Sequence, residues 1–209
     1  MALLKVLAFA LLSSVVTAAL GASFCPNPTV TKTELVKAPS GRHVNFTSVT
    51  CGLTAESTEL KTGLPVGNFP IIAPAPVIKV RDVLEARSAA ECIFSPCACG
   101  ETCGLTLCEA PPVPISETDC LDLAEDLESL AGTDFILAPF AAEFATLGTC
   151  KTSIGNAQPD TSLQACFDDW ASLAFQLSEV CPGGVSECVS VVNGAFVQEW
   201  IVEVFSSTD

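Results

Sequence analysis

Polar and apolar positions follow two different patterns along the 209 residues. Up to about residue 87 the chain lacks helical periodicity, and the alternation from Val30 to Val36 predicts a short strand. Prolines at 65, 70, 74 and 76 disfavour helix and predict an extended linker. We therefore expect residues 23–87 to form an irregular, short-β N-terminal segment that is Pro-rich toward its end.

From Ser116 onward the spacing of apolar positions is helical. It predicts four helices, over residues 117–131, 133–147, 161–180 and 186–205. Ser116 and Ser186 are the expected N-caps, and Thr161 with Gln164 forms a capping box. We expect residues 88–209 to be an acidic, Cys-rich, all-α domain, folded as a disulfide-stapled four-helix bundle.

The last of these helices has apolar residues around most of its circumference, among them Val192, Phe196 and Trp200. Glu199 and Glu203, four residues apart, are expected to mark its solvent side. Burial between the other helices is the simplest explanation. The alternative is an exposed apolar face that binds a partner, a lipid or another copy of the chain.

Residues 1–22 have the features of a secretory signal peptide. Lys5 precedes an apolar run from Val6 to Leu20, and small residues follow at the expected cleavage position. The run is too short and too rich in small residues to favour a retained membrane span. We therefore predict a secreted, extracellular protein without an integral membrane span.

Cysteine usage supports the same compartment. All cysteines follow the signal, and an even number in a secreted chain indicates disulfides. We expect Cys25 to pair with Cys51, whereas the spacing of the other ten leaves their connectivity open. A thiolate metal cluster is the less favoured alternative for these cysteines. The twelve positions are Cys25, Cys51, Cys92, Cys97, Cys99, Cys103, Cys108, Cys120, Cys150, Cys166, Cys181 and Cys188.

The segment Leu84-Glu85-Ala86-Arg87 stands between the Pro-rich stretch and the Cys-rich domain. This layout resembles that of small secreted cysteine-rich proteins of filamentous fungi. The resemblance implies cleavage after Arg87, which would make residues 23–87 a pro-region; an ordinary exposed linker is the alternative. Asn45-Phe46-Thr47 is a usable N-glycosylation sequon, which predicts a glycan on Asn45.

Charge is distributed unevenly between the two parts. Residues 88–209 contain 19 acidic residues and a single basic one, Lys151, whereas residues 23–87 contain seven basic and five acidic residues. So strong a negative balance excludes nucleic acid and disfavours anionic lipid, and it favours cationic partners or metal cations. Solubility of a secreted domain that works at low pH is the simpler explanation, and the one that we favour.

Residue types limit the chemistry further. His43 is the only histidine, and the chain has no tyrosine, so residues 88–209 cannot build a Ser-His-Asp triad or a Cys-His pair. The remaining candidates are two groups of carboxylates, on the first and third predicted helices. They could ligate calcium or act on a glycosidic bond, or they could simply face water. These candidates are Asp122, Glu125, Asp126 and Glu128, with Asp168 and Asp169.

Together these observations predict a secreted protein without catalytic activity or cofactor. Its expected role is an interaction module that binds an extracellular protein, a glycan or a lipid. A calcium-binding or cation-binding module is the second hypothesis, and a carboxylate-dependent hydrolase acting on carbohydrate is the third. The oligomeric state does not follow from the sequence.

Overall fold

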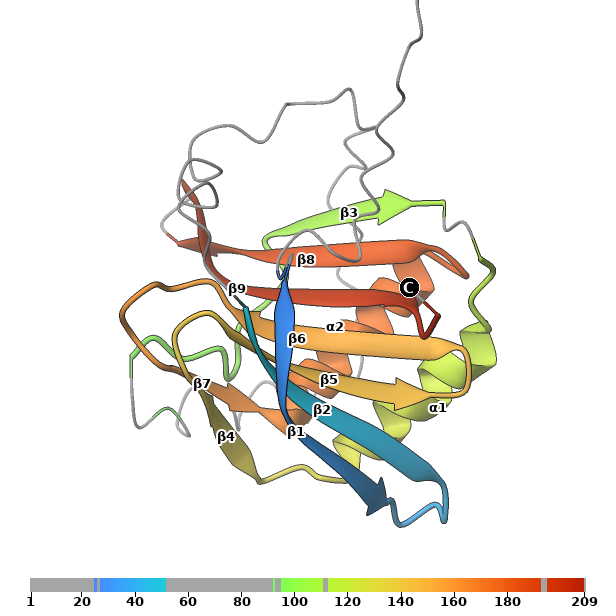
Figure 1. Ribbon diagram of the computed structural model, residues 1–209. Coiled ribbons are helices and arrows are strands. Elements are labelled where there is room, and N and C mark those ends of the chain that lie inside the picture. Colours follow the sequence, from blue (N-terminus) through green and yellow to red (C-terminus); the bar gives the residue numbers. More distant parts are fainter. Residues whose placement is uncertain are drawn as a thin grey trace, which may run out of the picture.

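The computed structural model describes residues 25, 27–51, 92, 95–110, 113–192 and 195–208. Over these residues the chain forms antiparallel sheets with two helices packed behind the larger one (Figure 1). The all-α four-helix bundle that we predicted from the sequence is therefore wrong. The described part of the chain is mostly β.

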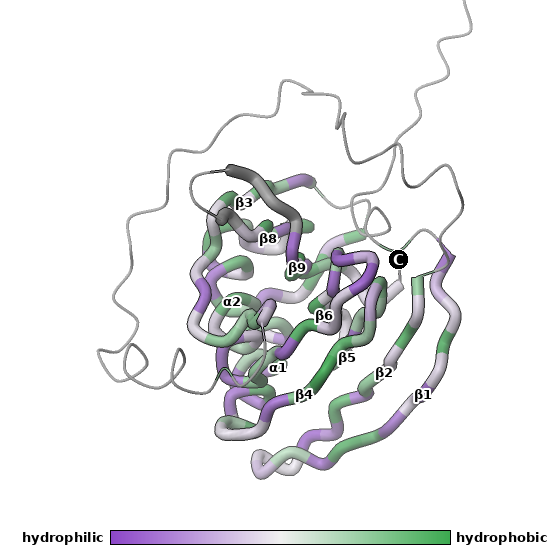
Figure 2. Tube along the Cα trace, turned by 90° about the vertical axis from the view of Figure 1, so that its left-hand side faces the viewer, coloured by the Kyte–Doolittle hydropathy of each residue, from purple (hydrophilic) through white to green (hydrophobic). Residues whose placement is uncertain are grey.

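The larger sheet has seven strands in the order β1-β2-β5-β6-β9-β8-β3, and each neighbouring pair is antiparallel. Its edge strands are β1 and β3, and β1 and β2 extend away from the helices (Figure 2). A separate two-stranded sheet pairs β4 (Asp134–Leu137) with β7 (Leu163–Cys166). The strands of the larger sheet are β1 (Pro28–Lys37), β2 (His43–Cys51), β3 (Leu105–Glu109), β5 (Ala141–Leu147), β6 (Cys150–Asn156), β8 (Val185–Val192) and β9 (Ala195–Ser206).

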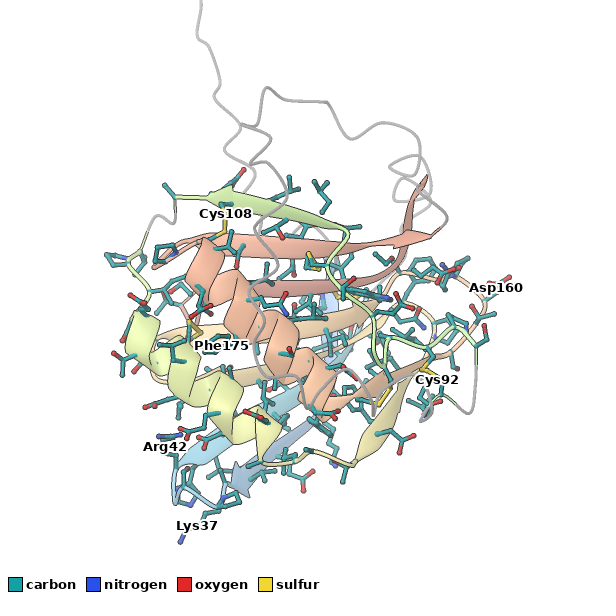
Figure 3. All side chains as sticks on the ribbon, turned by 180° about the vertical axis from the view of Figure 1, so that it is seen from behind. Lys37, Arg42, Cys92, Cys108, Asp160 and Phe175 are labelled. Carbon is teal, nitrogen blue, oxygen red and sulfur yellow. A yellow bond between two sulfur atoms is a disulfide. The ribbon has the colours of Figure 1, made fainter. Side chains whose placement is uncertain are left out.

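The two helices, α1 (Glu117–Glu128) and α2 (Phe167–Val180), lie side by side on one face of this sheet (Figure 3). The predicted N-cap of α1 is confirmed, since the Ser116 Oγ accepts a hydrogen bond from the Asp119 N–H. The helices are antiparallel: the start of α2 hydrogen-bonds to Thr133, just beyond the end of α1. No helix among the described residues is long and apolar enough to cross a membrane.

The second predicted helix, over residues 133–147, is instead two strands, β4 and β5. A turn at Pro139 and Phe140 separates them, and Phe140 has a positive φ of 49° that ends any regular element. A near-continuous apolar run fits a buried strand as well as a buried helix. Periodicity alone therefore could not distinguish the two.

The fourth predicted helix is also wrong, because residues 185–206 form the paired strands β8 and β9. Their valine-rich sequence favours strand, since β-branched side chains pack well on a pleated surface. β9 is buried on both faces, so apolar residues occupy both sets of alternating positions. We had interpreted this pattern as a helix with apolar residues around most of its circumference. Ile201 and Val202, which point to opposite faces, are both buried.

The third predicted helix is correct only from Phe167 onward. Residues 163–166 form β7, whose residues are all buried, and the chain passes directly from this strand into α2. In the N-terminal segment, by contrast, the strand predicted from the alternation between Val30 and Val36 is confirmed as part of β1.

The main core lies between the helices and the sheet. Trp170 of α2 is fully buried and donates a hydrogen bond from its indole N–H to the Thr152 Oγ1 of β6, at 3.1 Å. Phe46 of β2 packs edge-on against both Phe167 and Trp170. These contacts show that even-numbered residues of β6 and β2 face the helices. The N-terminal segment thus contributes directly to the main core.

All twelve cysteines are paired, in six disulfides, which is typical of secreted or extracellular proteins. The expected Cys25–Cys51 pair joins the N-terminal segment only to itself. Cleavage after Arg87 stays a prediction, because Arg87 lies outside the described residues, as do residues 1–22. Such a cut would leave residues 27–51 attached by non-covalent contacts alone. The other five pairs are Cys92–Cys97, Cys99–Cys166, Cys103–Cys188, Cys108–Cys181 and Cys120–Cys150.

Candidate ligand-binding groove

The carboxylates that we predicted as a possible site are divided by the structure into three environments. Asp122, Glu125 and Asp126 of α1 face the turn between β1 and β2. Asp168 of α2 lies in a groove between the two helices. Asp169 lies beside the Cys99–Cys166 disulfide. The two sequence groups therefore do not form one metal site.

The α1 carboxylates bind Arg42, a residue that the sequence did not mark as functional. The spacing of residues 122, 125 and 126 places their side chains on one face of α1. The Arg42 guanidinium reaches Asp126 Oδ2 at 2.8 Å, Glu125 Oε2 at 3.0 Å and Asp122 Oδ1 at 3.2 Å. These carboxylates hold the pKa of Arg42 above its usual range, chiefly through the hydrogen bonds to Asp126 and Glu125.

The turn that carries Arg42 is built to reach α1. Gly41 adopts a positive φ of 91°, a conformation in which glycine is favoured, and this closes the tight turn between β1 and β2. Ser40 in the same turn donates a hydrogen bond from its Oγ to Asp126 Oδ1 at 2.7 Å. Asp126 is only 2% exposed, so its charge is buried and fully engaged by the turn.

On the side of α1 that faces α2, the two helices leave a groove with a volume of about 450 Å³. This is within the range of small-molecule sites, which is about 300–1,000 Å³. Its α1 wall is made by Leu121, Asp122, Ala124, Glu125 and Glu128. Its α2 wall is made by Asp168, Ala171, Ser172, Phe175 and Gln176.

Asp168 is the distinctive member of this groove. Its residue is 4% exposed, and its Oδ1 is buried without a hydrogen-bond partner. Buried carboxylate oxygens in native proteins are nearly always paired, because an unpaired one loses its hydration without compensation. A buried carboxylate oxygen without a donor among the described residues therefore belongs to a residue of the groove wall.

Metal binding fits these residues poorly. Among the described residues, the two groups of close potential ligands consist of Cys92, Cys97 and Cys99, and of Cys99, Cys166 and Asp169. Their sulfur atoms are joined in disulfides and are not thiolates. Three of the six carboxylates that we proposed for calcium already hold Arg42.

The other predicted site residues lie elsewhere. Asn45 is half-buried on β2, next to the edge strand of the sheet, where it pairs with Leu35 of β1 and Thr146 of β5. Trp200 is 1% exposed and belongs to the main core, so it cannot form part of an exposed apolar face. Val192 and Phe196 belong to β8 and β9, and their side chains are outside the described part of the structure.

Sequence reasoning also misassigned Glu203, a glutamate on the face of the sheet away from the helices. Glu187 of β8 and Glu203 of β9 are directly opposite each other, and both are buried. Burial raises the pKa of Glu187, and burial together with the charge of Glu187 raises the pKa of Glu203 to about 8. We had expected Glu203 to mark a solvent side. The signal available in the sequence was the valine-rich run around Glu203, which favours a strand.

Comparison with known proteins identified no relative of this chain. The chain matches no protein-family model, no curated protein and no solved structure. Its function is therefore argued from its own residues.

Proposed function

We propose that this protein is a secreted, non-catalytic binding module whose ligand lies in the groove between α1 and α2. The buried, unpartnered Oδ1 of Asp168 carries the proposal, because it is a polar group that a ligand could satisfy. The apolar side chains of Leu121 and Phe175 offer surface that a ligand could cover.

The surroundings of the groove support binding more than catalysis. Asp122 and Glu125, two of the three carboxylates on its α1 wall, are engaged by Arg42. A carboxylate that is held in an ion pair is a poor general acid, because the cation opposes its protonation. His43 lies on β2, in the strand that follows the Arg42 turn, and it does not line the groove.

The framework supports a site of this kind. The disulfides Cys99–Cys166 and Cys108–Cys181 hold the two ends of α2 to the segment that precedes α1. Cys120–Cys150 holds α1 to β6. Helices fixed at their ends keep a groove open without a ligand, which reduces the entropy that binding must overcome.

The test is a fragment titration that assumes no ligand charge. The full chain is expressed through a eukaryotic secretory pathway, isotope-labelled protein is collected from the medium, and amide signals are followed while neutral, anionic and cationic fragments are added. We expect perturbed signals to gather at residues 121–128 and 168–176. Shifts scattered over the surface, or none with any fragment, would refute the groove as the site.

A matched variant separates the groove from the helices that form it. Ser172 is half-buried in the α2 wall, so S172W fills the groove without changing charge or replacing a core residue. We expect this variant to keep its fold and lose the fragment-induced shifts. Unchanged shifts in S172W would place the binding elsewhere.

A further inference from the structure

The two ends of the groove differ in chemistry. Because α1 and α2 are antiparallel, Glu128 at the end of α1 and Asp168 at the start of α2 belong to the same end. Leu121 and Phe175 belong to the other end, where Cys181 after α2 is tied to Cys108 before α1. Figure 3 shows Phe175 between the helices, toward the start of α1. One end of the groove carries the carboxylates of Asp168 and Glu128, and the other carries hydrocarbon from Leu121 and Phe175 beside Gln176 and Asp122, whose carboxylate Arg42 holds.

The geometry points to an amphiphilic organic cation as the ligand: an ammonium or guanidinium group at Asp168 and Glu128, joined to an alkyl or aryl body against Leu121 and Phe175. This inference rests on the proposed function, since it names the occupant of the same groove. A positively charged N–H donor would supply the hydrogen bond that Asp168 Oδ1 lacks.

A precedent for such a cation is present in the same helix. Arg42 brings a guanidinium to Glu125 and Asp122, two residues that also form the groove rim. α1 therefore already binds one organic cation, through two carboxylates that also line the groove. Glu128, one turn further along α1, is exposed and lines only the groove.

A bare metal ion fits the groove less well than an organic cation does. Calcium requires six to eight oxygen ligands. The groove offers Asp168 and Glu128 beyond the two carboxylates that Arg42 holds, and much of its remaining wall is hydrocarbon from Leu121, Ala124, Ala171 and Phe175. Hydrocarbon walls contribute affinity only to a ligand that has apolar surface of its own.

The test compares probes of one shape and different charge by calorimetric titration at pH 6. The probes are 2-phenylethylamine, which is cationic, 2-phenylethanol, which is neutral, and 3-phenylpropionate, which is anionic. We expect saturable binding of the amine and at least tenfold weaker binding of the other two. Methylammonium and Ca²⁺, which lack the apolar body, are expected to bind at least tenfold more weakly than the amine.

The sequence provides a matched pair of variants. D168N removes the charge from the groove, whereas D169N removes the same charge from the adjacent residue, which does not line it. We expect D168N to weaken amine binding tenfold or more, and D169N to change it less than twofold. E128Q, at an exposed position, repeats the test should D168N fail to fold, and F175A tests the apolar end.

Each contrary outcome has a definite meaning. Equal binding of the amine and the alcohol, or amine binding that is unchanged in both D168N and E128Q, overturns the cation assignment. Ca²⁺ binding that requires Asp168 and displaces the amine would make the groove a metal site and overturn it as well. Fragment shifts in the groove without any amine binding would refute this inference and leave the proposed function standing.

Discussion

Two carboxylates, Asp126 on the helix side and Glu203 on the opposite face of the sheet, are almost completely buried, at 2% and 4% exposure. The Asp126 carboxylate forms an ion pair with the Arg42 guanidinium and also accepts a hydrogen bond from the Ser40 hydroxyl. Glu203 receives a hydrogen bond from Ser153 at one oxygen, while its Oε1 is buried without a partner. Burial, together with the charge of Glu187, raises its pKa to about 8 against the smaller opposing effect of Lys151, so a protonated carboxyl is favoured below that pH.

The contrast explains why Asp168 is informative. A buried carboxylate is tolerated when a cation, a proton or several donors compensate for its lost hydration. Asp126 has the cation and Glu203 has the proton. Asp168 lies in the first turn of α2 and lines a groove, and its Oδ1 has no partner among the residues that the structure describes. In our proposal a ligand bound in the groove compensates for the lost hydration of Asp168.

The largest expected effect concerns the proton on Glu203. Its pKa is about 8 in the folded protein, against an ordinary value of 4.5, so the folded state binds more protons than the unfolded state between these pH values. Stability therefore falls as pH rises from about 4.5 to 8, by as much as about 4 kcal/mol from this group. E203Q, which resembles the protonated side chain, should remove most of this loss.

Urea unfolding of wild type and E203Q at pH 5 and pH 8 measures the effect. The two proteins should be similar at pH 5, and the variant should be the more stable at pH 8. E199Q, on the same strand at a half-exposed position, is the control and should follow wild type. Parallel pH curves for wild type and E203Q would mean that Glu203 is charged in the fold.

The next effect concerns the cation on Asp126. R42A leaves this carboxylate buried and without its cation, and breaking a buried ion pair typically costs about 3–5 kcal/mol. Arg42 itself is about one-third exposed, so we expect a smaller loss, of about 2–3 kcal/mol in the free energy of unfolding. R42K should recover only part of it, because an ammonium cannot reproduce the contacts of the planar guanidinium.

The measurement is urea unfolding at pH 6, with K37A as the control, since Lys37 is an exposed cation at the end of β1. In the double variant R42A/D126N the buried charge is absent, so it should be more stable than R42A alone. A double variant no better than R42A would show that the loss comes from packing of the turn and not from an orphaned charge.

Sequence reasoning was correct where local signals are strong. Ser116 caps α1, alternation predicts β1, and the even cysteine count matches a complete set of disulfides. It failed where apolar residues occupy every face. Residues 133–147 and 186–205 are apolar enough for a central helix or a central strand, and only pairing with distant strands decides between them.

The candidate site was predictable only in part. The carboxylates of α1 and Asp168 were identified from the sequence, but Arg42 lies 80 to 84 residues from its partners along the chain. No local pattern could reveal that contact or the groove between α1 and α2.

The smallest effect belongs to a carboxylate that hydrogen bonds compensate. Asp119 Oδ2 accepts hydrogen bonds from the Thr149 N–H at 2.7 Å and from the Thr149 hydroxyl at 2.8 Å. These bonds lower the pKa of Asp119. Water screens this half-exposed group, so we expect D119N to cost only about 1 kcal/mol at pH 7.

The sign of its pH dependence is opposite to that of Glu203. A lowered pKa stabilises the fold above the unfolded value of about 3.8 and loses that contribution as pH falls below it. The difference between wild type and D119N in urea unfolding should therefore shrink between pH 5 and pH 2.5. E117Q, an exposed carboxylate in the same first turn of α1, controls for the helix dipole. An equal loss in E117Q would assign the effect to that dipole. The hydrogen bonds from Thr149 would then have no role in stabilising the charged Asp119 carboxylate.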